Sequence, residues 1–385
     1  MYKQVIGWDV GGAHLKAALL HNGKLQQVMQ VPCALWRGVH ELEAAIDSLM
    51  TTFKIKSEET LHAITMTGEL VDLFENRQQG VESISSVMNA KLKGEKLFYA
   101  GMPGHQSRPN FVRIDEVAKN WSRIASANWL ASASYLGMEL ESLKNYSQIL
   151  LVDIGSTTSD FIVIKNGKPH CLAFTDATRL QTEELVYTGV IRTPLMALTQ
   201  KVRFKNKLTS LAAEYFATIA DVYRLTDDLD EANDMGDTAD GKEKTLQASA
   251  RRLARMIGHD VQDYDLEAWK ALANEFKQIQ LSRLIETAKQ HITRMGPAEA
   301  ITIVGAGAGS FLVKEIAAQF GLLYQDSVFL FSDLSEDVTN YKLNHKTTNK
   351  PIDKATDKTT DIKHGANVCL PAYAVACLAL NIGIT

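Results

Sequence analysis

The sequence predicts an α/β protein of two domains, and three segments carry that prediction. An apolar strand runs into an Asp-Gly turn at residues 5–16, and the same design recurs at residues 149–160. A third apolar strand, at residues 300–304, runs into a glycine-rich turn and a helical pattern. The two similar turns lie about one domain's length apart. A chain of 385 residues, 45% of them apolar, can bury substantial cores, and its length suggests two domains.

The first turn places a carboxylate and backbone amides at the end of one strand. Asp9 stands two residues before Gly11, and Gly12 and Ala13 continue the turn. A glycine turn lets backbone amides face an anion at close range, so we predict a phosphate-binding turn with Asp9 as a magnesium ligand. Lys16 is a candidate point charge for a phosphate, and a place on the hairpin surface is the alternative.

The second turn repeats this pattern and adds hydroxyl groups. Asp153 stands two residues before Gly155, and Ser156, Thr157 and Thr158 follow. We expect this turn to bind phosphate as well, with Asp153 as a second magnesium ligand, because magnesium takes one or two carboxylates together with phosphate oxygens. Two such hairpins facing each other would hold a phosphate chain and its cation from both sides. An ordinary acidic turn residue is the alternative for either Asp taken alone.

The rest of the chain alternates strands and helices. Short apolar strands are expected at residues 63–66 and 96–99, and one long helix is expected at 114–135. From about residue 205 to 295 helix formers dominate, which predicts a helical insertion in the second domain. The apolar segment 368–385 is short for a bilayer span and predicts a buried final helix.

The third motif has two interpretations. Gly305, Gly307 and Gly309 precede a helical pattern from Phe311 to Phe320, an arrangement that brings a backbone close to a nucleotide or phosphate. The alternative is a dinucleotide fingerprint with Asp326 as the ribose acid. That alternative fits less well, because the spacing is GxGxG rather than GxGxxG and both Asp-Gly turns are left unexplained.

Polar side chains outside the turns are further candidates. Glu69 follows a predicted strand and is a candidate acid or base, with helix capping by Thr67 as the alternative for this segment. Arg192 is a candidate anion ligand. Arg251 and Arg255 lie four residues apart, a helical spacing that suits one phosphate between them, and a solvated basic face is the alternative.

Composition limits the function classes. The net charge of −4 and the isoelectric point near 6.2 give no general attraction to nucleic acid or to a membrane. Four cysteines without CxxC spacing indicate neither a disulfide framework nor a zinc site, and no secretory signal is seen, so we expect a cytoplasmic protein. Residues 346–361 repeat a polar tetrapeptide four times, which predicts a flexible, solvated loop; recruitment of an anionic ligand by its lysines is the alternative.

The ordered trio of motifs resembles the phosphate-1, phosphate-2 and adenosine motifs of the actin, sugar kinase and Hsp70 superfamily. That resemblance implies a ribonuclease H-like fold of two α/β domains with a cleft between them. It implies a first domain of residues 1–145 and 366–385, and a second domain of residues 146–365. The helical insertion, the glycine turn at 305–310 and the repeat at 346–361 then belong to the second domain.

Four runs of sequence carry a closer resemblance. They resemble the hydantoinase/oxoprolinase-related family linked to tetrahydromethanopterin-dependent one-carbon transfer, and they are Ile6–Lys16, Thr65–Leu70, Asp153–Asp160 and Tyr187–Pro194. Archaeal members of that family act in methanofuran biosynthesis. They join an aminomethylfuran-methyl diphosphate to the phenol of γ-glutamyltyramine and release diphosphate. In a methylotrophic bacterium the corresponding product would be methylofuran.

This resemblance implies a transferase that forms an aryl-alkyl ether from a tyramine- or tyrosine-type phenol. Asp9 and Asp153 would place Mg²⁺, and the glycine turns would donate amides to the departing diphosphate. Glu69 or Asp176 would act as the base for the phenol. The three candidate arginines would bind the diphosphate or the glutamyl carboxylate.

Two other classes stay open at this point. One is an ATP-dependent phosphotransferase, or an ATP-dependent amide hydrolase of the hydantoinase/oxoprolinase type, with ATP bound near residues 305–310. The other is a nucleotide-gated binding protein. For the two enzyme classes we expect small-molecule substrates, with no nucleic acid and no membrane as a partner.

Overall fold

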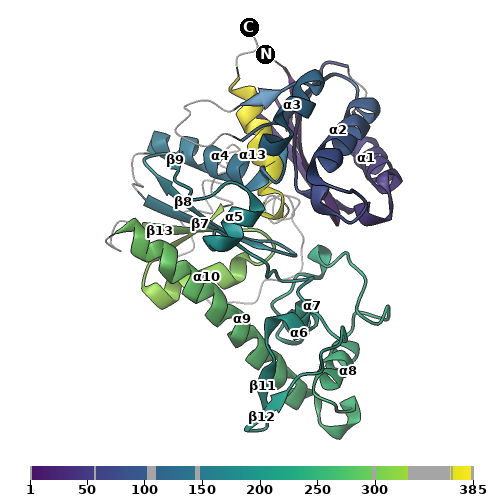
Figure 1. Cartoon of the computed structure of the whole chain (residues 1–385), viewed down its shortest axis with the longest axis vertical. Helices are drawn as coiled ribbons and strands as arrows, with labels where there is room; N and C mark the ends of the chain where they lie inside the picture. The colour runs from purple at the N-terminus through teal and green to yellow at the C-terminus, as the bar shows by residue number, and fades with distance from the viewer. Residues whose placement is uncertain are drawn as a thin grey trace. The chain divides into compact units, whose positions relative to one another are not determined.

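The computed structural model describes residues 2–55, 58–101, 110–143, 148–296, 301–327, 365 and 367–382. The chain divides into two compact units (Figure 1). The first consists of Met1–Asn145, Ile164–Pro169 and Asp326–Thr385, and the second of Tyr146–Val163 and His170–Gln325. The repeat at 346–361 lies outside the described residues, as do the predicted domain limits at 145/146 and 366, so these expectations stay predictions.

The first unit contains a sheet of six strands in the order β3-β2-β1-β4-β5-β6. The first three strands form an antiparallel meander, to which two parallel strands and a short antiparallel edge are added. The strands are β1 (Gln4–Val10), β2 (His14–His21), β3 (Lys24–Pro32), β4 (Thr60–Met66), β5 (Glu95–Tyr99) and β6 (Phe111–Val112). The first predicted hairpin and both predicted strands are confirmed.

Helices cover both faces of this sheet because side chains alternate along each strand. Ile6, Trp8 and Val10 share a core with α1 (Val39–Phe53) and α2 (Arg77–Lys91). Gly7 points to the other face, where a Cβ would lie 1.8 Å from the carbonyl oxygen of Ala372 in α13 (Leu370–Leu380). Glycine at this position therefore allows α13 to pack on β1, and the predicted buried final helix is confirmed.

The single helix predicted at residues 114–135 is wrong. The chain forms a 3₁₀ turn, Ile114–Glu116, then α3 (Val117–Ile124), and then starts a new helix, α4 (Asn128–Leu143). Ser126 breaks the run because its φ is +49°, a left-handed conformation in which its hydroxyl bonds to Glu69 at 2.6 Å. A tertiary hydrogen bond thus overrides the local helical pattern.

A second sheet, most of which belongs to the second unit, has its strands in the order β10-β8-β7-β13-β14, with β9 paired to β8. The predicted second hairpin and the third strand are confirmed, and β13 runs parallel to β7. The strands are β7 (Gln148–Ile154), β8 (Ser159–Lys165), β9 (Lys168–Pro169), β10 (Leu185–Val186), β13 (Ile301–Ala306) and β14 (Leu323–Asp326); α5 (Asp176–Gln181) and α10 (Ser310–Phe320) accompany them. The predicted α/β fold class is confirmed.

The insertion is less uniform than predicted. Besides helices it contains a β-hairpin, in which Lys205 and Asn206 adopt φ values of +49° and +64° and reverse the chain. The elements are α6 (Leu195–Leu198), β11 (Lys201–Phe204), β12 (Lys207–Ser210), α7 (Ile219–Leu225), α8 (Leu246–Met256) and α9 (Leu266–Met295). Figure 1 shows α9 running from the sheet of this unit to the β11–β12 hairpin, and both contact it.

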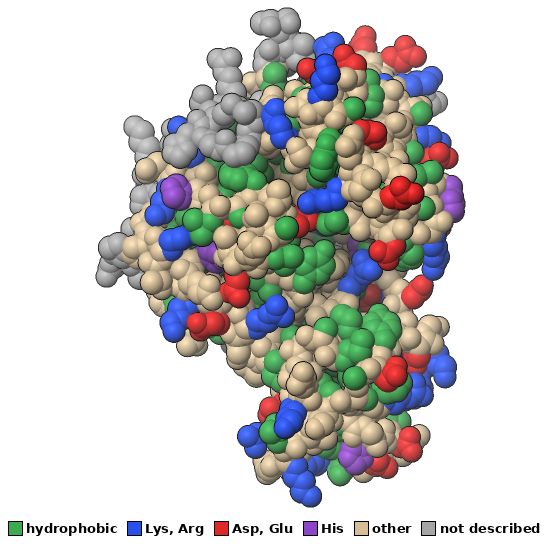
Figure 2. All heavy atoms as spheres, in the orientation of Figure 1, with side chains coloured by type: hydrophobic (Ala, Val, Ile, Leu, Met, Phe, Trp, Pro, Cys, Tyr) green, Lys and Arg blue, Asp and Glu red, His purple; other side chains and the backbone are tan. Residues whose placement is uncertain are grey.

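Four more 3₁₀ turns complete the described elements: Leu35–Arg37, Gly68–Leu70, Glu231–Asn233 and Val261–Asp263. No helix in the described ranges combines the length and apolarity needed to cross a membrane. On the face drawn in Figure 2, Lys and Arg side chains are interspersed with Asp and Glu, which agrees with the small net charge.

Candidate phosphate-binding turns

The hairpin of the second unit turns at a carboxylate and two amides. Asp153 lies near the end of β7, and the amide of Gly155 donates to the carbonyl of Thr158 at 2.9 Å, which closes the turn. Among the residues that the structure describes, the amides of Ser156 and Thr157 have no acceptor. Two successive half-buried amides without an acceptor, beside hydroxyl groups, suit an oxygen of a phosphate.

The carbonyl side of this turn is held by residues 188–193. Three successive amides donate to the carbonyls of Gly155 and Ser156 at 2.8 to 3.1 Å, and they belong to Val190, Ile191 and Arg192. Gly189 approaches so closely that a Cβ on it would lie 2.5 Å from the nitrogen of Thr157. The carbonyls of the turn are therefore occupied by the protein, and the backbone of the predicted anion ligand Arg192 is fixed against it.

The glycine turn lies directly against Asp153. Ala306 pairs with Asp153 in the parallel register of β13 and β7. Gly307 follows with a φ of +81°, and a Cβ there would lie 2.4 Å from Asp153 Oδ1 and 2.3 Å from the carbonyl of Ile154. Gly309 donates to that carbonyl at 2.8 Å. Only glycine lets the backbone pass the carboxylate at 307.

The remaining glycine of this motif has a packing role. A Cβ at Gly305 would lie 2.9 Å from the ring of Tyr324 and 3.1 Å from Val313. Gly305 thus allows β14 and α10 to pack against β13. The structure brings Gly307 and Gly309 to the second hairpin, whereas Gly305 contacts the core behind it, and the phosphate-binding role predicted for the three glycines stays a prediction.

The first unit repeats the turn geometry beside Asp9. The amide of Gly11 donates to the carbonyl of His14 at 3.0 Å, and the amides of Gly12 and Ala13 have no acceptor in the described part of the chain. The carbonyls of the same two residues accept amides of the following loop at 3.1 and 2.9 Å. Both turns are thus anchored through their carbonyls and keep two amides available for an anion.

Asp9 is 4% exposed and forms a row with Lys16 on β2 and Thr65 on β4. Lys16 Nζ lies 4.0 Å from one carboxylate oxygen, and Asn128, the first residue of α4, donates to the other at 3.4 Å. The hydroxyl of Thr65 is buried and has no partner among the described residues. An unpartnered buried hydroxyl beside a carboxylate marks a place for a further polar ligand.

A buried ion pair supports the loop that precedes α4. Ser126 Oγ donates to Glu69 at 2.6 Å, and Arg77 Nη2 lies 3.1 Å from the same carboxylate and 2.7 Å from Ser126. Burial raises the pKa of the Glu69 carboxyl, and the bonds from Ser126 and Arg77 oppose that shift. Through its bond with Ser126, Glu69 supports the loop that leads to Asn128. Its predicted role as a base stays a prediction without a contact in favour of it.

The residues around Asp9 and around Asp153 suit Mg²⁺ only when a phosphate ligand supplies further oxygen atoms. No group of three or more His, Cys, Asp or Glu side chains that could hold a metal ion occurs among the described residues. Mg²⁺ needs one or two carboxylates and fills its other positions with water and phosphate oxygens. Each carboxylate lies next to a turn with two acceptor-free amides, so the residues fit a Mg²⁺-phosphate ligand rather than a bare ion.

Residues 60–325 match the model of the hydantoinase/oxoprolinase family. The chain belongs to this family. The match confirms the family that the four sequence runs indicated. It includes the Asp153 hairpin, the insertion and the glycine turn, whereas the Asp9 hairpin precedes it.

Two proteins that are similar to this chain bear the name of a synthase. The "(4-{4-[2-(gamma-L-glutamylamino)ethyl]phenoxymethyl}furan-2-yl)methanamine synthase" of Methanocaldococcus jannaschii is 29% identical over 320 residues, which are 83% of this chain and 90% of that protein. The synthase of the same name from Methanococcus vannielii is 34% identical over 170 residues, 44% of this chain and 75% of that protein. The sequence-based prediction of an enzyme is in accord with both names.

Solved structures align over long stretches at low identity. Acetone carboxylase covers 82% of this chain and 67% of its own, with a TM-score of 0.49 and 11% identity. Component A of (R)-2-hydroxyglutaryl-CoA dehydratase from Acidaminococcus fermentans covers 98% of this chain and 99% of its own, with a TM-score of 0.41 and 12% identity.

The other candidate base, Asp176, lies at the start of α5. The same helix carries Arg179, which forms a buried ion pair with Asp160 of β8 at 2.8 Å. Burial raises the pKa of Asp160, Arg179 opposes the shift, and the charge of Asp176 adds to it. The structure thus places Asp176 near the second strand of the hairpin, and its role as a base stays a prediction.

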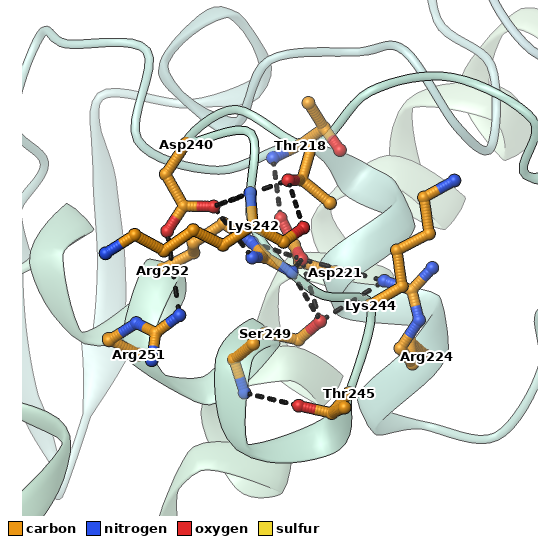
Figure 3. Close-up of polar contacts among 12 residues, drawn as sticks. Thr218, Asp221, Arg224, Asp240, Lys242, Lys244, Thr245, Ser249, Arg251 and Arg252 are labelled. Carbon is orange, nitrogen blue, oxygen red and sulfur yellow. Dashed lines mark hydrogen bonds and ion pairs between the residues drawn. The ribbon is translucent and has the colours of Figure 1, made fainter.

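Arg251 and Arg255 do share one anion, but it belongs to the chain. Their guanidinium groups lie 3.8 and 3.7 Å from Asp240 Oδ2, and Arg252 binds the other oxygen at 3.0 Å. Figure 3 shows Asp240 beside Arg251 and Arg252, with Asp221 behind them. A phosphate at these arginines would have to displace Asp240, and their predicted role as phosphate ligands stays a prediction.

Two polar residues escaped the sequence analysis. Asn128 belongs to no motif. Because one unbroken helix was predicted here, the sequence did not indicate that Asn128 begins a new helix next to Asp9. Gln280 is fully buried on α9 and donates to Thr188 and Gly189, behind the second turn. The available signal was a glutamine within an apolar stripe that includes Phe276 and Leu284.

Proposed function

We propose that this protein is an ether-forming transferase of furan cofactor biosynthesis. It would join an aminomethylfuran-methyl diphosphate to a tyramine- or tyrosine-type phenol and release diphosphate. The observation that carries the proposal is the pair of anchored turns, each with two acceptor-free amides beside an aspartate, because they suit a diphosphate group. The names of the archaeal relatives supply the product type, a phenoxymethyl furan with a γ-glutamyl amide.

The reaction exchanges one carbon–oxygen bond for another. The phenol oxygen attacks the methylene carbon of the furan, the bond from that carbon to the diphosphate oxygen breaks, and the electron pair leaves with the diphosphate. The phenol proton passes to a base, for which Asp176 and Glu69 are the candidates. Amides of the turns would donate to the oxygens on which negative charge grows.

Mg²⁺ fits this proposal as the cofactor. Asp9 and Asp153 are its candidate ligands, each beside its own turn, and Mg²⁺ bound there would neutralise charge on the leaving diphosphate. Lys16, whose amine lies 4.0 Å from the carboxylate of Asp9, would add a positive charge beside the diphosphate. Arg192, whose backbone is fixed on the second turn, is the candidate ligand for a diphosphate oxygen or a substrate carboxylate. We place the reaction in the cytoplasm, within tetrahydromethanopterin-linked one-carbon metabolism.

One observation favours a second candidate, an ATP-dependent phosphotransferase or amide hydrolase. The glycine turn lies against Asp153 and begins α10, as expected for a turn that approaches a nucleotide. ATP would then take the place that the first candidate gives to the furan diphosphate.

The test is a turnover assay with the full chain and Mg²⁺. The aminomethylfuran-methyl diphosphate is offered with γ-glutamyltyramine, tyramine or tyrosine, and both diphosphate release and the mass of the ether are followed. Ether and diphosphate in equal amounts, without ATP, support the transferase. Phosphate release that requires ATP, with no ether formed, supports the second candidate and refutes the first.

A further inference from the structure

The longest helix of the insertion, α9, buries three polar side chains, Gln280, Thr287 and His291, and Gln280 bonds to the backbone beside the second turn. α9 buries a stripe of apolar side chains that includes Phe276, Leu284 and Ala288, and Gln280 lies in that stripe with no exposed surface. A buried side-chain amide without hydrogen-bond partners would destabilise the fold, so the partners of the Gln280 amide indicate what this residue does.

The Gln280 amide links the backbone beside the second turn to α7 of the insertion. Nε2 donates to Thr188 Oγ1 at 2.7 Å and to the carbonyl of Gly189 at 2.8 Å. Oε1 accepts from the hydroxyl of Tyr223 on α7. Burial raises the pKa of Tyr223, so this hydroxyl keeps its proton and donates. The amide plane is therefore fixed from both ends.

The residues that Gln280 holds are the ones that press on the turn. Thr193 Oγ1 accepts from the amide of Gly189 at 2.9 Å, and Ser159 donates to the carbonyl of Thr188 at 2.6 Å. The peptide of Gly189 in turn lies against the Ser156–Thr157 peptide, where even a methyl group would collide. The backbone of Thr188 and Gly189 thus links Gln280 to the peptide whose amides, those of Ser156 and Thr157, have no acceptor among the described residues.

We infer that Gln280 is a positioning residue for the Asp153 turn, and that the insertion serves as the frame from which this turn is held. The inference rests on the proposed binding of diphosphate. With Gln280, Tyr223 and Thr188 in place, the amides of Ser156 and Thr157 keep one orientation before the ligand arrives. Binding then needs little ordering of the turn, which favours affinity.

The test compares Gln280→Leu with Gln278→Leu, the same change two residues earlier on the exposed side of α9. A second pair is Thr188→Val and Thr188→Ser, because serine keeps the hydroxyl. Each full-length variant is titrated calorimetrically with inorganic diphosphate and Mg²⁺, its melting temperature is measured, and deuterium exchange is followed in peptides that cover residues 153–160.

We expect Gln280→Leu and Thr188→Val to weaken diphosphate binding by about tenfold, since each leaves buried polar groups unpaired. Exchange at residues 153–160 should rise in both, while Gln278→Leu matches the wild type and Thr188→Ser recovers most of the affinity. A folded Gln280→Leu protein with wild-type affinity and exchange overturns the inference. If Gln280→Leu does not fold, the threonine pair decides by the same criteria.

The two proposals fail in different ways. If the wild type does not bind diphosphate, the proposed function fails, and the exchange measurements still decide whether Gln280 orders the turn. If the wild type binds diphosphate and neither Gln280→Leu nor Thr188→Val changes the affinity, only the positioning role is refuted.

Discussion

The Asp9 turn and the Asp153 turn have the same backbone geometry but different supports. Each is closed by one amide-to-carbonyl bond, at 3.0 Å from Gly11 and 2.9 Å from Gly155, and each is anchored through its carbonyls. Behind the Asp9 turn lie charged groups, among them Glu69. Behind the Asp153 turn lie neutral groups, chiefly Gln280, and a glycine backbone. Backbone hydrogen bonds thus hold both turns, whereas the nearby side chains are an ion pair, Glu69 with Arg77, in the first unit and a neutral amide, Gln280, in the second.

This difference predicts where each turn is most vulnerable. Close packing fails when an atom is added, neutral hydrogen bonds fail when one partner is removed, and a buried ion pair responds to pH. The following changes separate these cases.

The largest effect is expected for Gly307→Ala. The added carbon would lie 2.4 Å from Asp153 Oδ1, and the φ of +81° adds a backbone cost of about 1 kcal/mol, so the turn and the carboxylate must separate. We expect diphosphate binding with Mg²⁺ to fall below detection in a calorimetric titration. Gly236→Ala is the control, because nothing lies within 4 Å of its Cβ position. Unchanged affinity in Gly307→Ala would mean that Asp153 is not part of the site.

The next effect is expected for Asp9→Asn and Asp153→Asn, each of which keeps the shape and removes one charge. Loss of a magnesium ligand should lower the rate of diphosphate release by about 100-fold and raise the Mg²⁺ concentration needed for half of the maximal rate. Asp9→Asn also leaves Lys16 without its carboxylate. If both variants keep the Mg²⁺-dependent rate of the wild type, the assignment of the two turns to one reaction is wrong.

A smaller and pH-dependent effect is expected for Glu69→Gln. Burial raises the pKa of Glu69 above its ordinary value of 4.5, so the folded state binds more protons than the unfolded state between 4.5 and the raised value. The contribution of Glu69 to the stability of the fold is thus fully present below pH 4.5 and is lost as the pH rises through the raised pKa of the folded state. Relative to Glu69→Gln, the melting temperature of the wild type should fall by a few degrees over this range.

The comparison is a series of paired melting curves at rising pH. A constant difference between the wild type and Glu69→Gln would show that Glu69 has an ordinary pKa in the fold. Asp47→Asn, at an exposed ion pair with Lys91, provides the control for a general charge effect.

The smallest effect is expected for Arg255→Ala. This arginine is 41% exposed and lies 3.7 Å from Asp240, a geometry that contributes less than about 1 kcal/mol. We expect less than a threefold change in diphosphate affinity by titration. A tenfold loss would restore the sequence-based assignment of Arg255 as a phosphate ligand, and would mean that Asp240 moves aside for the ligand.

The sequence predicted those features that depend on local chemistry. The two turns and the third strand follow from apolar runs that end at Asp and Gly, and the buried final helix follows from an unbroken apolar segment. The family followed from four runs of sequence, which are Ile6–Lys16, Thr65–Leu70, Asp153–Asp160 and Tyr187–Pro194. These features need no knowledge of distant partners, which is why they could be predicted.

Features set by distant contacts could not be predicted. The helical pattern at residues 114–135 is interrupted because Ser126 finds Glu69, 57 residues earlier in the chain. The spacing of Arg251 and Arg255 predicted one shared anion but not that Asp240 provides it. The role of Gln280 depends on a partner 92 residues away. In each case a polar group is satisfied by a residue that its local sequence does not specify.

The missing side chain of Gly7 also has a consequence for synthesis of the protein on the ribosome. The face of β1 at Gly7 is covered by α13, and the nearby thiol of Cys369 lies 3.7 Å from the carbonyl of Met29, 340 residues earlier. The face of the sheet at Gly7 therefore stays uncovered until residues 370–380 have emerged, although the sheet and the core on its other face are translated first. We therefore expect a chain whose translation stops before residue 370 to expose this apolar face and to aggregate more readily than the full chain.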